Sequence, residues 1–187
     1  MKTPYQSIVL IGKTGCGKGT QAALLAEKFG YQVFSTGNEV RKIGSQPTPL
    51  GRRINEIQVA GWVPEWLASY LMTKAVLESG ETGLVFESVA RKLVEAEKLN
   101  EMHEMLERSY VVIHLDIDDE TATERMLARN RDASDQTENI VKRLASFHNE
   151  TKYSLEFFSE KGKVQRVDAD QPLEKVFDDI IKLLQSE

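Results

Sequence analysis

The sequence predicts an α/β fold in three layers, with a five-stranded parallel sheet and helices on both of its faces. Short apolar runs alternate with longer helical patterns along the 187 residues, which is typical of a parallel sheet with crossover helices. A glycine-rich turn joins the first apolar run to the first helical pattern. At this length, a single domain with a sizeable core is the simplest organisation.

The elements are expected in alternating order. The candidate strands are the apolar runs at 7–11, 32–35, 84–87, 110–115 and 164–167, and the helical patterns cover about 20–29, 64–78, 91–107, 119–129, 137–160 and 173–185. Gly30 and Gly162 follow helical patterns, where a left-handed terminal residue is needed. Ligands of such sheets bind beyond the carboxyl ends of the strands. We therefore expect the glycine-rich turn, residues 35–37, Glu87 and Asp116 to meet there.

The glycine-rich turn, Gly-Lys-Thr-Gly-Cys-Gly-Lys-Gly-Thr from Gly12 to Thr20, has the spacing of a phosphate-binding loop. Glycines let successive backbone N–H groups converge on phosphate oxygens, and the N-terminus of the following helix adds partial positive charge. Lys18 supplies a mobile cation for the outer phosphates. A glycine turn without a ligand is the alternative, but the strand–turn–helix context favours a P-loop nucleoside triphosphate hydrolase-like fold. The candidate ATP-binding residues of this loop are Gly12, Gly15, Cys16, Gly17, Lys18, Gly19 and Thr20.

The end of the loop differs from the generic motif. Gly19 follows Lys18 where a serine or threonine is usual, and the hydroxyl comes one place later, at Thr20. The resulting Gly-Lys-Gly-Thr-Gln resembles the loop of adenylate kinases and related nucleoside monophosphate kinases. The resemblance extends from Ile8 to the last helix and is to the short-lid type of this family.

A second motif resembles the start of the monophosphate-binding segment of adenylate kinases. The chain reads Ser-Thr-Gly-Asn up to Asn38, followed by Arg41, where the family has Ser-Thr-Gly-Asp and an arginine. The resemblance implies that Arg41 holds the monophosphate, that Thr36 lies beside its base and that Val63 belongs to the same site. Residues 36–66 are then the nucleoside-monophosphate-binding insertion. Alone, the motif would be read as a helix cap.

The third motif departs most from the family. Adenylate kinases carry Asp-Gly-Phe-Pro-Arg after the third strand, and this chain reads Glu-Ser-Val-Ala-Arg from Glu87 to Arg91. A carboxylate at a strand end near a phosphate loop usually orders magnesium or its waters. We therefore expect Thr20 and Glu87 to serve Mg²⁺, Glu87 through water. Arg91 is expected to bind phosphates.

Glu95 occupies the place of a family glutamine that reads the adenine of the acceptor. An ionised carboxylate accepts hydrogen bonds but donates none. It can accept from the amine of adenine or cytosine, or from the ring N–H and amine of guanine. This substitution leaves the acceptor base open.

Four arginines follow within a short stretch. Arg125 and Arg129 lie four residues apart and share a helix face, and by the resemblance they bind ATP. Arg143 matches a family arginine at the phosphates, whereas Arg131 matches only in role because the lid, residues 129–136, is shorter than usual. A solvated, salt-bridged face is the alternative, because acidic residues are adjacent. With the arginines, the expected catalytic residues are Lys18, Arg91, Arg129, Arg131 and Arg143, and those for the monophosphate are Thr36, Arg41, Val63, Arg91, Glu95 and Arg143.

These motifs together predict an adenylate kinase-like phosphotransferase. It would move the γ-phosphoryl group of MgATP reversibly to AMP, giving two ADP, with Mg²⁺ as the cofactor. Such a reaction needs positioning and charge stabilisation more than covalent chemistry. Two alternatives stay open: a kinase for CMP, UMP or GMP, and a nucleotide-binding paralogue with little catalysis.

Composition limits the partners. The net charge of −5 argues against a nucleic-acid-binding surface. The single cysteine, Cys16, excludes an intramolecular disulfide and a cysteine-rich zinc site and fits a reducing compartment. No apolar run approaches the length of a membrane span. We therefore expect a cytoplasmic monomer whose partners are ATP and AMP or another nucleoside monophosphate, with no nucleic acid and no membrane.

Overall fold

The computed structural model describes residues 3–60, 63–129 and 137–185. Within these residues, the sheet has five parallel strands in the order β2-β3-β1-β4-β5. Their bounds are β1 Ser7–Gly12, β2 Gln32–Ser35, β3 Leu84–Glu87, β4 Tyr110–Asp116 and β5 Val164–Asp168. The predicted parallel sheet is confirmed, and β1, β4 and β5 each extend one residue further than expected. In the central strand, Val9 lies opposite Phe86 of β3 and Val112 of β4.

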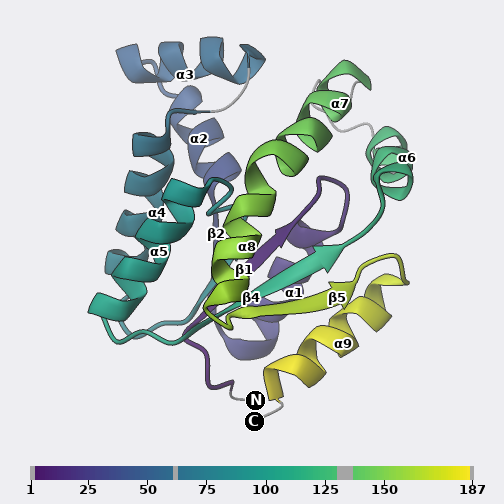
Figure 1. Ribbon diagram of the computed structural model, residues 1–187. Helices are drawn as coiled ribbons and strands as arrows, with labels where there is room; N and C mark the ends of the chain where they lie inside the picture. The colour runs from purple at the N-terminus through teal and green to yellow at the C-terminus, as the bar shows by residue number, and fades with distance from the viewer. Residues whose placement is uncertain (1–2, 61–62, 130–136, 186–187) are drawn as a thin grey trace.

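Helices cover both faces of the sheet (Figure 1). The helices are α1 Lys18–Phe29, α2 Thr36–Gly44, α3 Pro49–Ala60, α4 Glu65–Ser79, α5 Leu93–Met105, α6 Asp119–Arg129, α7 Thr137–Ser146, α8 Lys152–Glu160 and α9 Leu173–Gln185. A π-helical turn, Phe147–Thr151, joins α7 to α8, so the helix predicted over 137–160 has one local change of winding. None of the described helices is long and apolar enough to cross a membrane.

The core lies on both sides of β1, because its successive side chains alternate between the faces. Ile8 and Leu10 pack with residues of α1, α6, α7 and α9. Val9 and Ile11 pack with residues of α4, α5 and α8. All four are at most 3% exposed, which explains why the strand is a continuous apolar run rather than an alternating one.

Two predicted boundaries are wrong at one helix. The pattern over 91–107 predicts that Arg91 begins a helix, but α5 starts at Leu93 and ends at Met105. Arg91 lies instead in the turn after β3, in which Ser88 and Ala90 have φ values of 62° and 51°. Glu107 also has a positive φ, 50°, because the chain reverses there toward β4.

Helices α2 and α3 stand beyond the carboxyl end of the sheet (Figure 1). They pack on each other through Ile54, which is 1% exposed, and through a hydrogen bond from Asn55 Nδ2 to the Gly44 carbonyl (2.9 Å). Both helices lie within residues 36–66, the segment predicted to be the nucleoside-monophosphate-binding insertion. That residues 36–66 bind a monophosphate stays a prediction. So does the lid, of which residues 130–136 lie outside the described residues.

Candidate active site

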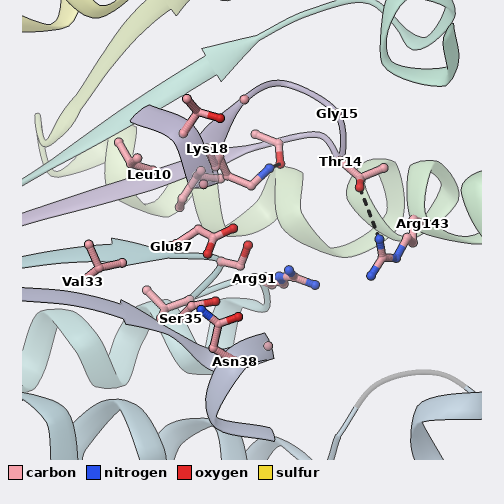
Figure 2. Close-up of a pocket in the computed structure, with 18 of the residues that line it drawn as sticks. Leu10, Thr14, Gly15, Lys18, Val33, Ser35, Asn38, Glu87, Arg91 and Arg143 are labelled. Atoms are coloured by element: carbon pink, nitrogen blue, oxygen red, sulfur yellow. Dashed lines mark hydrogen bonds between the residues drawn. The ribbon is translucent and has the colours of Figure 1, made fainter. Parts of the chain in front are cut away.

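A cavity of about 700 Å³ lies at the carboxyl ends of β1, β2 and β3 (Figure 2). The phosphate-binding loop forms one wall, the β2–α2 junction and the turn after β3 form others, and α6 and α7 contribute arginines. Of the predicted site residues, the cavity brings together Gly12, Gly15, Gly17, Lys18, Gly19, Thr20, Arg41, Glu87, Arg91, Arg125, Arg129 and Arg143. The phosphate-binding loop, Ser35 with Gly37, and Glu87 therefore meet at one edge of the sheet, as the sequence predicts for these segments. Asp116, which was also expected at this edge, does not line the cavity, and its carboxylate forms an ion pair with Arg166.

The phosphate-binding loop has the backbone that its glycines predict. Gly15 and Gly17 have φ values of 84° and 92°, in the region where only glycine is unstrained, and Gly17 is the N-cap of α1. The Lys18 ammonium donates hydrogen bonds to the carbonyls of Gly12 (2.7 Å) and Lys13 (2.6 Å). Cys16 is 2% exposed, packs in the core behind the loop and does not line the cavity.

Glu87 and Thr20, the residues expected to serve Mg²⁺, both line the cavity beside this loop. A methyl group placed on Gly19 would lie 3.3 Å from Glu87 Oε1, so the absence of a side chain at position 19 leaves room for the longer carboxylate. Among the described residues, no group of three or more His, Cys, Asp and Glu side chains could hold a metal ion. Hydroxyl and carboxylate oxygens, such as those of Thr20 and Glu87, are ligands that suit Mg²⁺ when phosphates and waters complete its coordination.

Arg91 extends from the turn after β3 into the cavity between Glu87 and Ser35 (Figure 2). Burial, and next the like charge of Arg143, lower its pKa to about 10, so the guanidinium stays charged at neutral pH. Its backbone N–H donates to Glu95 Oε2 (2.9 Å). Glu95 is 8% exposed, burial raises the pKa of its carboxyl, and it does not line the cavity.

Arg125 and Arg129 of α6 and Arg143 of α7 all line the cavity, although Arg129 is also exposed to solvent. Arg125 donates to the Ala169 carbonyl (2.8 Å) and to Asp170 (3.2 Å) in the loop after β5. Arg143 Nη1 donates to Thr14 Oγ1 (3.4 Å), which links α7 to the phosphate-binding loop (Figure 2). Arg131 lies outside the described residues.

The β2–α2 junction forms the opposite wall. Arg41 Nη2 donates to Asn38 Oδ1 (2.5 Å), so one turn of α2 fixes the direction of this guanidinium. Thr36 begins α2 but does not line the cavity. Val63 lies outside it as well, in a shallower groove formed with Ile57, Pro64, Glu65, Trp66, Lys92 and Lys98.

Sequence reasoning missed the contribution of the π-helical turn. Phe147 and Thr151 line the cavity, and they follow Arg143 at spacings of four residues, which is the signal that could have found them. It also missed a polar link beneath the loop. Asp119, at the start of α6, accepts from Lys13 Nζ (2.6 Å) and lies 2.9 Å from His148 Nε2.

Comparisons with known proteins give matches over most of the chain. The family model described as adenylate kinase matches residues 10–163. An adenylate kinase of Synechococcus sp. (strain JA-2-3B'a(2-13)) is 33% identical over 184 residues, which are 95% of each chain. An adenylate kinase of Nocardia farcinica is 33% identical over 181 residues, covering 95% of this chain and 98% of the relative. "Adenylate kinase 1" of Synechocystis sp. is 31% identical and covers 96% and 97%.

Proposed function

The chain belongs to the adenylate kinase family, and we propose that it transfers the γ-phosphoryl group of MgATP to AMP, reversibly, giving two ADP. One observation carries the proposal. Cations from separate segments line a single cavity beside the phosphate-binding loop: Lys18, Arg41, Arg91, Arg125, Arg129 and Arg143. One bound nucleotide does not require cations on both the loop and the β2–α2 wall, whereas two nucleotides facing each other do.

The proposed reaction is an in-line displacement. An oxygen of the AMP phosphate forms a bond to the γ-phosphorus of ATP, the bond from that phosphorus to the β–γ bridging oxygen breaks, and the leaving group is ADP. The attacking oxygen is already anionic, so no general base is required. Catalysis then rests on holding charged groups in line and on stabilising charge at the transferring phosphoryl.

The protein groups divide between the two nucleotides. The loop N–H groups, Lys18 and Arg129 would hold the ATP phosphates, and Arg41 would hold the AMP phosphate. Arg91 and Arg143 extend toward the same space (Figure 2), which suits the phosphoryl in transit. Mg²⁺, held by Thr20 directly and by Glu87 through water, would supply charge neutralisation at the β- and γ-phosphates.

We assign further properties with this function. Residues 36–66 would close on AMP and residues 129–136 on ATP, excluding water from the reaction. We also propose that the enzyme acts as a monomer. The single cysteine fits a reducing compartment, and we place the enzyme in the cytoplasm.

The direct test is a product assay with MgATP and AMP, CMP, UMP or GMP. We expect rapid ADP formation with AMP and slower transfer to the others, because the relatives with which the chain aligns over nearly its full length are adenylate kinases. Faster transfer to another monophosphate would reassign the acceptor. ATP binding without transfer to any of them would refute the kinase proposal.

A further inference from the structure

The turn that carries Arg91 is held in a costly conformation. Ser88 and Ala90 both have left-handed φ values, which cost non-glycine residues roughly 1–2 kcal/mol each. Such a turn persists only when its surroundings determine it. Part of this support is burial, since Val89 and Ala90 are 2% and 1% exposed and belong to the core between the sheet, α4, α5 and α8.

The rest of the support acts on one peptide group, the one that joins Ala90 to Arg91. Its carbonyl, on Ala90, accepts a hydrogen bond from Ser154 Oγ of α8 (2.5 Å). Its N–H, on Arg91, donates to Glu95 Oε2 of α5 (2.9 Å). Ser154 is fully buried and Glu95 is 8% exposed, so water does not replace either partner.

Fixing both polar ends of this peptide fixes its plane. The plane determines the ψ of Ala90 and the φ of Arg91, and through them the direction in which the Arg91 side chain leaves the backbone. We propose that Ser154 and Glu95 are positioning residues for Arg91, acting from two helices through the peptide group that joins Ala90 to Arg91. This inference rests on the proposed function, in which Arg91 binds the transferring phosphoryl.

The arrangement also connects Arg91 to the wall of the cavity formed by α7 and the π-helical turn. Ser154 lies one turn after Thr151 of the π-helical turn, which lines the cavity, and that turn continues from α7 with Arg143. The segment formed by α7, the π-helical turn and α8 therefore carries Arg143 itself and also Ser154, which binds the turn that holds Arg91. The role assigned to Glu95 differs from the base-reading role implied by the family glutamine.

The test is a double-mutant cycle on kcat for ADP formation. Wild-type turnover is measured first, and its absence would count against the proposed function and not against the positioning. Ser154→Ala should lower kcat about tenfold, because the buried Ala90 carbonyl loses its donor and the turn loosens. The KM for ATP should change less than about twofold, since the phosphate-binding loop is untouched.

The matched control is Ser79→Ala. Ser79 is 6% exposed, and its hydroxyl also donates to a backbone carbonyl, that of Val76 (2.8 Å), but it lies outside the cavity lining. We expect its kcat to stay within about twofold of wild type. A fall in kcat equal to that of Ser154→Ala would show that burial of any serine hydroxyl matters, and would overturn the inference.

The decisive arm repeats Ser154→Ala in the Arg91→Ala background. If Ser154 acts through Arg91, the second substitution should leave the residual kcat unchanged. An equal tenfold loss in both backgrounds would reveal general destabilisation and refute the positioning role.

A parallel experiment uses Glu95→Leu, which removes the acceptor and should behave like Ser154→Ala. Glu95→Gln keeps an acceptor oxygen and should recover part of the loss. Failure of Glu95→Gln to exceed Glu95→Leu would equally contradict the inference.

Discussion

Two alanine substitutions in the phosphate-binding loop separate backbone strain from packing. A methyl group on Gly17 would meet nothing within 4 Å, so Gly17→Ala costs only the left-handed φ of 92°, about 1–2 kcal/mol. Gly15 has a similar φ of 84°. Its methyl group, however, would lie 2.7 Å from the Ala122 carbonyl oxygen and 3.3 Å from Met126 Cγ.

The difference matters because Ala122 belongs to the backbone of α6, the helix that carries Arg125 and Arg129. To reach an ordinary contact of at least 3.4 Å, the loop must move away from these arginines or α6 must move with it. A displacement of roughly 1 Å in a reacting geometry can cost about a hundredfold in rate. We therefore expect kcat/KM for ATP to fall about tenfold in Gly17→Ala and at least about a hundredfold in Gly15→Ala.

The assay is initial-rate ADP formation with saturating AMP and varied ATP, with thermal unfolding to confirm that both variants are folded. The test depends on which of the two variants loses more kcat/KM for ATP. Equal losses, or a greater loss in Gly17→Ala, would mean that strain alone matters and that the contact between loop and α6 does not position the phosphates.

Three further predictions follow from single residues. Lys18→Ala should lower kcat for ADP formation by about a hundredfold or more. The control Lys28→Ala, on the exposed end of α1, should change kcat little. Comparable losses in the two variants would show that Lys18 does not bind the phosphates. Burial lowers the pKa of His103 to about 4, so the unfolded state binds more protons than the folded state between pH 6.5 and 4. The free energy of unfolding should therefore fall by up to about 3 kcal/mol as the pH drops through this window. Urea titrations of His103→Gln should show a flatter dependence of this free energy on pH. EDTA should abolish transfer, and Glu87→Ala should raise the Mg²⁺ concentration needed for half-maximal rate; an unchanged Mg²⁺ titration would rule out Glu87 as a holder of the ion or its waters.

The sheet and the phosphate-binding loop could be predicted because their signals are local. Ile8 to Ile11 form one apolar run since the strand is buried on both faces, and the glycines of the loop are required by its own backbone. The arginine pair on α6 follows from helical spacing alone. In each case a few neighbouring residues contain the whole physical reason.

The turn after β3 could not be predicted, because its conformation is imposed from outside. Serine at 88 and alanine at 90 give no sign of a left-handed backbone, and the helical pattern therefore seemed to start at Arg91. Ser154 stands 64 residues from the carbonyl that it binds, and nothing near it in the chain marks it as more than an ordinary helical serine. The π-helical turn was missed because it spans only five residues between two α-helices, too few to show a period of their own.

The whole chain and its cavity carry charge of opposite sign. The chain has a net charge of −5, whereas the charged side chains of the described lining are one carboxylate and six cations: Glu87 against Lys18, Arg41, Arg91, Arg125, Arg129 and Arg143. Like charges gathered in one cavity repel each other. The pKa of Arg91 is lowered first by burial and next by the like charge of Arg143. We expect phosphates to remove this repulsion and, because the cations stand on α1, α2, α6, α7 and the turn after β3, to draw these elements together. We therefore expect both nucleotides to favour closure of the site, each by supplying the anion that its wall lacks.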